Sequence, residues 1–181
     1  IGSLPIKDNN KYRNRSIMIN PKGKIAAYYD KIKMFDVKLP NKEKHQESKT
    51  YKPGKRLVSV KLPWGNLGLT ICFDLRFPEI YRNLSKKNIK FISVPSAFTK
   101  VTGQKHWLTL LKARAIENFC FIFAPNQVGR NTKKRQTFGH SVIISPDGKI
   151  LKIKKKGVGI IYSNIDPGES FRLRKIIPSL K

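Results

Sequence analysis

Short apolar runs separated by turn sequences predict strands along most of the chain. Two pairs of such runs are joined by four-residue turns with Pro in the second place and Gly in the fourth, at residues 20–23 and 145–148. Pro fixes φ in such a turn and Gly releases the chain, so the flanking strands fold back as hairpins. We therefore expect one hairpin from strands 15–20 and 24–29, and another from strands 141–145 and 149–153.

The segment between the hairpins alternates apolar strand patterns with helical ones. Strands are predicted over residues 57–62, 66–72, 90–95 and 120–124, and helices over 77–87 and 104–119; a last strand is predicted over 159–165. In the second helix Leu108, Leu111, Ala115 and Phe119 recur on one face. This alternation indicates a layered α/β domain. Residues 37–53 form a long polar stretch without a pattern, which is typical of functional or disordered loops.

Composition is consistent with one globular domain over residues 1–181. The chain has 39% hydrophobic residues and no apolar stretch long enough to span a bilayer. Its two cysteines, Cys72 and Cys120, are too few for a disulfide framework. Both lie in apolar runs, as reduced cysteines often do, and this favours a cytoplasmic location.

The net charge of +27 would attract nucleic acid or an anionic membrane. However, Lys and Arg are spread over most segments, with only short clusters at residues 133–135 and 154–156. Charge alone gives only nonspecific affinity. We therefore expect neither a specific nucleic-acid partner nor a membrane partner, although a basic nucleic-acid-binding protein remains an alternative interpretation.

Cys72 stands at the junction between an apolar run and a polar one, Phe73-Asp74-Leu75-Arg76. The pattern predicts a strand that ends at a thiol, followed by a sharp turn and a helix. Nucleophiles are often presented in this way, on a rigid support. A lone cysteine is more often buried and inert, so the assignment depends on the surrounding motifs.

Lys31 and Glu47 are candidates whose ordinary interpretation is a surface charge and a loop ion pair. Lys31 lies in Tyr29-Asp30-Lys31-Ile32-Lys33-Met34-Phe35-Asp36, and Glu47 lies in Gln46-Glu47-Ser48-Lys49-Thr50. With 11 acidic residues against 38 basic ones, a carboxylate has many possible cationic partners. Neither residue would be chosen as catalytic without the other motifs.

Together these segments resemble the motifs of the nitrilase, or carbon–nitrogen hydrolase, superfamily. The lysine segment resembles its lysine motif, and Gly68-Leu69-Thr70-Ile71-Cys72-Phe73-Asp74-Leu75-Arg76 resembles its cysteine motif. Further matches follow in the same order: Thr102-Gly103-Gln104-Lys105-His106-Trp107, Ala113-Arg114-Ala115-Ile116-Glu117-Asn118, Pro125-Asn126-Gln127-Val128-Gly129 and Phe138-Gly139-His140. The resemblance covers nearly the whole chain and is closest to the branch of deaminated glutathione amidases and omega-amidases.

The resemblance implies an α-β-β-α sandwich and a Glu–Lys–Cys triad with a second glutamate. Cys72 would be the nucleophile, forming a thioester from a small linear amide and releasing ammonia. Lys31 and the backbone N–H of Phe73 would stabilise the oxyanion, and Glu47 would be the second glutamate. No cofactor or metal is implied. Family members commonly form homodimers or larger homo-oligomers, and the expected partner is a small-molecule amide.

One part of the family pattern is absent from these residues. The general-base glutamate lies on an early strand before the lysine motif, whereas no glutamate precedes Glu43 here. The resemblance therefore implies that the first strands and helices of the sandwich are missing. We expect this polypeptide alone to have little or no amidase activity, since loss of a general base costs ~10²–10⁴-fold in rate. The alternative is a catalytically incomplete member that acts by binding.

Other residues near the motifs have less specific interpretations. Ala97, Phe98 and Asn126 follow strands on the side of Cys72, where they would contact substrate or simply pack. Asp74, Arg76 and Glu79 are expected to form a structural ion-pair set that holds the turn. His106 and His140 lack the spacing of a zinc site, so no metal is predicted.

Overall fold

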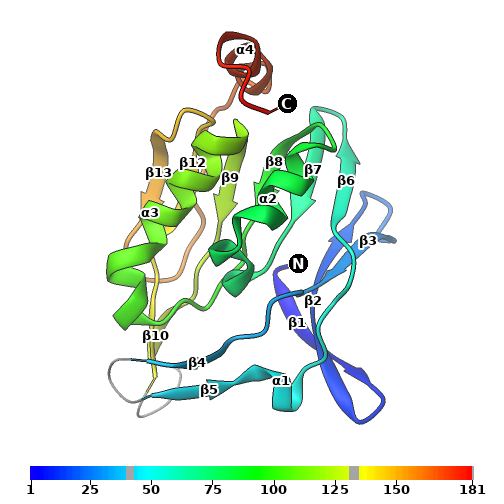
Figure 1. The fold of residues 1–181 in the computed structure, drawn as a ribbon, viewed down its shortest axis with the longest axis vertical. Coiled ribbons are helices and arrows are strands. Elements are labelled where there is room, and N and C mark those ends of the chain that lie inside the picture. The colour runs from blue at the N-terminus through cyan, green and yellow to red at the C-terminus, as the bar shows by residue number, and fades with distance from the viewer. Residues whose placement is uncertain (40–42, 131–134, 181) are drawn as a thin grey trace.

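A six-stranded mixed sheet forms the centre of the computed structural model, which describes residues 1–39, 43–130 and 135–180 (Figure 1). The strand order is β13-β12-β9-β8-β7-β6. The strands are β6 (Val58–Leu62), β7 (Gly65–Leu69), β8 (Ile89–Ser93), β9 (Phe121–Ala124), β12 (Ser141–Ile144) and β13 (Ile150–Lys154). β7, β8 and β9 pair in parallel, and the outer pairs are antiparallel. The carboxyl ends of the parallel strands therefore meet at one edge of the sheet.

Two helices cover one face of this sheet, α2 (Pro78–Ser85) and α3 (Lys100–Asn118) (Figure 1). Pro78 begins α2, where its missing N–H costs no hydrogen bond. Trp107, Leu111 and Ala115 of α3 are fully buried against the sheet, together with α2 side chains such as Leu84. Among the described residues, no helix is long and apolar enough to cross a membrane.

A second sheet of three antiparallel strands lies beside the first: β1 (Ser3–Asp8), β2 (Lys11–Ile19) and β3 (Ile25–Asp30). Its contact with the large sheet is a small buried cluster of Tyr29, Leu69 and Ile71. Tyr29 points from β3 into this cluster and is completely buried. The cluster joins the segment that carries Lys31 to the segment that carries Cys72.

Smaller elements surround one end of the two sheets. The stretch 37–53 was expected to lack structure, and that expectation is wrong for its described part. It contributes to the hairpin of β4 (Asp36–Lys38) and β5 (Lys44–Gln46), and then forms the single helical turn α1 (Glu47–Thr50). The remaining elements are the 3₁₀ helix η1 (Cys72–Arg76), the short pair β10 (Val128–Arg130) and β11 (Gln136–Phe138), and the helix α4 (Glu169–Ile176).

The predicted strands and helices agree with the structure to within a few residues, with one exception. The strand 66–72 ends earlier, at Leu69, and the helix 104–119 begins earlier, at Lys100. The predicted strand 159–165 is wrong, because these residues form no strand and pair with none of the described strands. Ile160 and Tyr162 are each 76% exposed, whereas Ile161 and Ile165 are partly buried. Residues 133 and 134 of the basic cluster 133–135 lie outside the described residues.

Candidate active site

Cys72 occupies a tight turn after the parallel strand β7. Its φ of +47° places a side-chain-bearing residue in the left-handed region, which is strained and often marks functional sites. The turn is fixed from the next strand, since the Cys72 N–H donates to Pro95 O at 3.0 Å and Thr70 N–H donates to Ser93 O at 3.1 Å. Cys72 also begins the 3₁₀ helix η1. The sharp turn and the helix predicted after the thiol are therefore confirmed, whereas the strand ends at Leu69, before it reaches Cys72.

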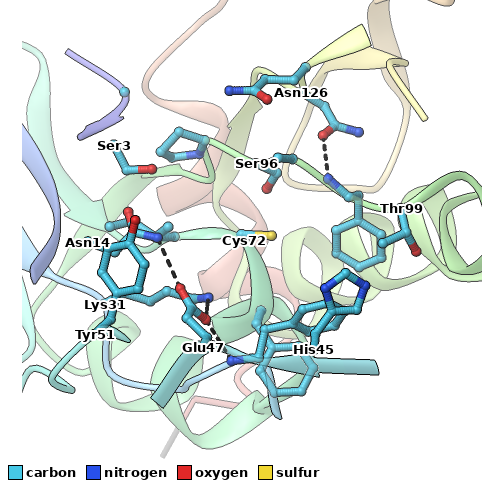
Figure 2. Close-up of a pocket in the computed structure, with 18 of the residues that line it drawn as sticks. Ser3, Asn14, Lys31, His45, Glu47, Tyr51, Cys72, Ser96, Thr99 and Asn126 are labelled. Carbon is cyan, nitrogen blue, oxygen red and sulfur yellow. Dashed lines mark hydrogen bonds and ion pairs between the residues drawn. The ribbon is translucent and has the colours of Figure 1, made fainter. Parts of the chain in front are cut away.

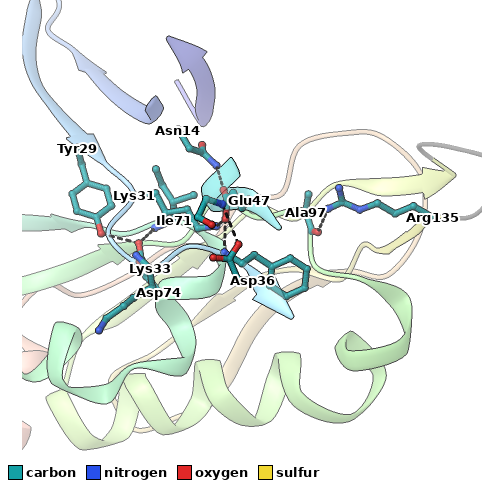
Figure 3. Close-up of polar contacts among 12 residues, drawn as sticks. Asn14, Tyr29, Lys31, Lys33, Asp36, Glu47, Ile71, Asp74, Ala97 and Arg135 are labelled. Carbon is teal, nitrogen blue, oxygen red and sulfur yellow. Dashed lines mark hydrogen bonds and ion pairs between the residues drawn. The ribbon is translucent and has the colours of Figure 1, made fainter. Parts of the chain in front are cut away.

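Lys31 and Glu47 form a largely buried ion pair. Lys31 directly follows β3 and is 2% exposed, and its Nζ donates to Glu47 Oε2. The same Glu47 oxygen accepts the backbone N–H of Phe35 at 2.6 Å, and Oε1 accepts Asn14 Nδ2 at 3.2 Å. Figure 3 shows these contacts converging on the Glu47 carboxylate. A buried ion pair is stabilised when hydrogen bonds satisfy its charged atoms, and both carboxylate oxygens of Glu47 have donors here.

A cavity of about 780 Å³ brings the predicted site residues together (Figure 2). Its volume lies in the range of small-molecule sites. The sequence-predicted residues that line it are Lys31, Glu47, Cys72, Phe73, Ala97, Phe98, Asn126 and Arg76. Glu47 is the one carboxylate among the described residues of this lining.

The backbone of Phe73 lies in the first turn of η1, directly after the thiol. Amides in the first turn of a helix have no acceptor within the helix, so they are suited to bind a negatively charged oxygen. The Phe73 ring packs edge-on against Phe35 and Phe77, with ring centroids 5.0 and 5.5 Å apart. This packing holds the turn in place beside the lysine segment.

Asn126 and Phe98 are tied to one another within the cavity wall. Asn126 Oδ1 accepts the Phe98 N–H at 2.9 Å, and its Nδ2 donates to Gly139 O at 2.6 Å. Phe98 is 4% exposed and packs on Trp107. These contacts support the packing interpretation of Phe98 and Asn126, while Ala97 presents its carbonyl to Arg135 at 3.2 Å.

The expected ion pairs among Asp74, Arg76 and Glu79 do not form among the described residues. Asp74 is completely buried and accepts from Tyr29 Oη at 2.7 Å, and from the N–H groups of Ile71 and Lys33, each at 2.9 Å. Burial raises the pKa of Asp74, and these hydrogen bonds oppose that rise. Glu79 pairs with Lys33 Nζ at 3.5 Å on the surface. The three side chains do not meet because they lie in different surroundings. Asp74 is buried in the interior, Arg76 lines the cavity and Glu79 is on the surface.

Arg76 points to the cavity and to α3. Its guanidinium lies 3.2 Å from His106 Nδ1 and 5.2 Å from the Phe98 ring centroid, and no carboxylate among the described residues pairs with it. Burial lowers the pKa of Arg76, and its proximity to Cys72 opposes that shift. The pKa of His106 is also lowered, by burial and by the nearby Arg76.

The sequence analysis missed several residues of the cavity wall. They are polar side chains to which the sequence analysis gave no role: Asn14, His45, Tyr51, Thr99, Thr102 and Arg135. The one available signal was that Thr102 lies in a segment that resembles a family motif. His45 packs on Phe35, and its Nε2 lies 3.2 Å from Glu43 Oε1. Residues 1–39, 43–130 and 135–180 contain no group of three His, Cys, Asp or Glu side chains that could hold a metal ion.

Comparison with known protein families agrees with this arrangement. The carbon–nitrogen hydrolase profile matches residues 1–175. The chain belongs to the carbon–nitrogen hydrolase family. Among curated relatives of this chain, the deaminated glutathione amidase of Synechocystis is 42% identical over 173 residues, which are 94% of this chain and 64% of the relative. The human deaminated glutathione amidase is 37% identical, over 93% of this chain and 52% of the relative.

Solved structures show the same fold. The Caenorhabditis elegans NitFhit protein superposes with a TM-score of 0.92 at 38% identity, over 98% of this chain and 44% of its own. Saccharomyces cerevisiae Nit3, a member of branch 10 of the nitrilase superfamily, superposes with a TM-score of 0.88 at 31% identity, over 99% of this chain and 64% of its own. The α/β nitrilase fold is therefore confirmed. The chain spans between about half and two thirds of the length of the curated relatives that it matches.

Proposed function

We propose that this carbon–nitrogen hydrolase builds the cysteine site of an amidase that cleaves a small linear amide and releases ammonia. The main observation in support is that the cysteine motif and the lysine motif line the same cavity. Cys72, held in a left-handed turn, and the buried Lys31–Glu47 pair come from different sheets and line the same cavity. An ammonium that lines the same cavity as a thiol can stabilise negative charge that develops when the thiol attacks an amide.

In the proposed reaction, Cys72 Sγ attacks the amide carbon and the carbonyl electron pair moves onto oxygen. The Lys31 ammonium and the Phe73 N–H stabilise this oxyanion. When the oxyanion collapses, the carbon–nitrogen bond breaks and a proton goes to the leaving nitrogen, so that ammonia departs and a thioester remains. Water then adds to the thioester, which releases the carboxylic acid and returns the proton to Cys72.

Proton transfer in this scheme requires a base, and Glu47 is poorly suited to that role. Its carboxylate already accepts from Lys31, Phe35 and Asn14. Glu47 would therefore hold Lys31, while a carboxylate beyond the described cavity lining would carry the proton. We expect the 181-residue polypeptide alone to turn over slowly, by ~10²–10⁴-fold relative to a site with a base. The same observation favours a second candidate, amide binding without turnover.

The cavity supports an amide that also carries a carboxylate. Arg76 reaches this wall with no carboxylate partner among the described residues. A planar guanidinium binds a carboxylate through two parallel hydrogen bonds. Deaminated glutathione, the compound that names the curated relatives, is an acidic amide of this kind.

The test compares acidic and neutral linear amides on the purified protein and on Cys72→Ala. Ammonia release and intact protein mass are followed together. We expect a mass increase equal to the acyl group on Cys72, which is absent from Cys72→Ala and slower in Lys31→Met. Ammonia release that persists in Cys72→Ala would contradict the proposed chemistry. Calorimetric binding of the acidic amide without any acyl adduct would select the second candidate.

A further inference from the structure

The carboxylate of Glu47 depends on a residue outside every motif. Two of its donors belong to the lysine segment, namely the Lys31 ammonium and the Phe35 N–H, and both bind Oε2. The other oxygen, Oε1, accepts from Asn14 Nδ2 at 3.2 Å. Figure 3 shows the Asn14 side chain approaching the Glu47 carboxylate. Because Glu47 is mostly buried, with its side chain 14% exposed, water cannot readily replace a lost donor.

Asn14 also holds Lys31 through its backbone. The Asn14 carbonyl accepts the Lys31 N–H at 2.9 Å, in the ladder between β2 and the end of β3. A single residue of β2 therefore contacts the main chain of the cation and the side chain of its anion. Lys31 and Glu47 are 16 residues apart and lie on different elements, so this shared contact fixes their relative position.

We propose that Asn14 is a positioning residue that orients the Glu47 carboxylate and thereby the Lys31 ammonium toward Cys72. This inference rests on the proposed function, since it assigns Lys31 a role at the thiol. With Oε1 held, Glu47 cannot rotate about its terminal bond, and Lys31 keeps one N–H on Oε2 and its other N–H groups for the developing oxyanion.

The side chain of asparagine suits position 14 better than a carboxylate or an apolar side chain would. An aspartate in place of Asn14 would set a second carboxylate against Glu47 Oε1 and would attract the Lys31 ammonium away from the thiol. An apolar side chain of similar size would leave Oε1 without a donor. Asn supplies the donor and leaves the Lys31–Glu47 pair neutral overall, so it serves both requirements.

The experiment measures alkylation of Cys72 by iodoacetamide between pH 6 and 9, by mass spectrometry of the full chain. Among the described residues, the ionisable groups that line the cavity around Cys72 are Lys31, His45, Glu47, Tyr51, Arg76 and Arg135. Of these only Lys31 is replaced, in one reference variant. The variants are Asn14→Asp and Asn14→Leu, with Lys31→Met as the reference. The matched control is Asn66→Asp, since Asn66 Nδ2 donates to Lys87 O at 3.3 Å on an exposed edge. Thermal melts followed by circular dichroism report folding.

We expect Lys31→Met and Asn14→Asp each to slow alkylation at pH 7 by at least threefold and to move the pH of half-maximal rate upward. Asn14→Leu should cause a smaller change in the same direction, and Asn66→Asp none. If Lys31→Met slows alkylation but both folded Asn14 variants match wild type, the Asn14 inference is overturned while the proposed function stands. If Lys31→Met itself matches wild type, the proposed function fails at its cation. Should Asn14→Asp not fold, Asn14→Leu carries the same comparison.

Discussion

Tyr29 provides the most direct test of how the two motifs are held together. Its hydroxyl donates to Asp74 Oδ2 at 2.7 Å, and both side chains are completely buried. Asp74 in turn accepts the N–H groups of Lys33 and Ile71, on the lysine segment and the cysteine turn. The substitution Tyr29→Phe removes one donor from this carboxylate and leaves the ring in place. Tyr81 offers a matched control, because it is equally buried and its hydroxyl contacts the neutral Thr70 hydroxyl at 3.0 Å.

The two hydroxyls should differ in energy because one acts on a carboxylate. A hydrogen bond to a charged group contributes about 1.5–3 kcal/mol, whereas a neutral one contributes about 0.5–1.5 kcal/mol. Tyr29→Phe should therefore reduce the free energy of unfolding by the larger amount and Tyr81→Phe by the smaller. With a urea dependence of roughly 2 kcal/mol per molar, the unfolding midpoint should fall by about 1 M for Tyr29→Phe and by about half of that for Tyr81→Phe.

The difference should also depend on pH with a definite sign. The Tyr29 hydrogen bond lowers the pKa of Asp74, against the rise that burial causes. Without it the folded-state pKa of Asp74 rises further, so the variant loses stability as pH increases through that pKa. The deficit of Tyr29→Phe should be small near pH 4 and larger at pH 7, while that of Tyr81→Phe stays constant. Urea titrations at both pH values decide the matter, and equal deficits for the two variants at pH 7 would refute the reasoning.

Three further predictions concern packing, thiol reactivity and substrate charge. A Cβ at Gly103 would lie 2.5 Å from Phe138 Cβ. Gly103→Ala should therefore lower the free energy of unfolding by about 1–3 kcal/mol. An unchanged urea midpoint would contradict this packing. Burial raises the pKa of Cys120 to about 12. The folded protein at pH 8 should therefore react with one iodoacetamide, at Cys72, and with a second only when urea unfolds it. Mass spectrometry counts the added groups in both states. Arg76→Gln should raise KM at least tenfold for an acidic amide and hardly change it for a neutral one. Equal changes in KM for both amides would show that Arg76 does not bind the carboxylate of the substrate.

The strand and helix pattern of the large sheet was predictable because its signals are local. Pro and Gly mark the hairpin turns, and short runs rich in apolar residues mark buried strands, such as Ile89–Ser93 with its buried Phe91 and Ile92. The segment 159–165 shows where this reasoning fails. Its apolar residues have the spacing of a strand, yet hydrogen-bond partners decide whether a strand forms, and these cannot be read from the segment itself.

In the candidate site, too, some features were predictable from local sequence and others were not. Cys72, Lys31 and Glu47 were identified because their flanking segments resemble known motifs. The surroundings of these residues were not predictable, since they depend on contacts between distant elements. Arg76 was expected to pair with Asp74 or Glu79 nearby in sequence, but η1 turns it toward His106, 30 residues away. Asn14 carries no local signal at all, because its importance arises only when β2 is placed beside α1.

These long-range contacts suggest that the site is assembled by docking of the small sheet on the large one. Asn14 joins the small sheet to Glu47, and the Tyr29–Asp74 hydrogen bond joins it to the cysteine turn. Both links lie close to Lys31, which follows Tyr29 at the end of β3 and donates its backbone N–H to Asn14 O. A perturbation that loosens the small sheet should therefore reduce Cys72 reactivity before it unfolds the large sheet, whose core lies on the opposite face under α2 and α3. The position of the cation relative to the thiol is thus a tertiary property, although each of the two residues is presented by its own local turn.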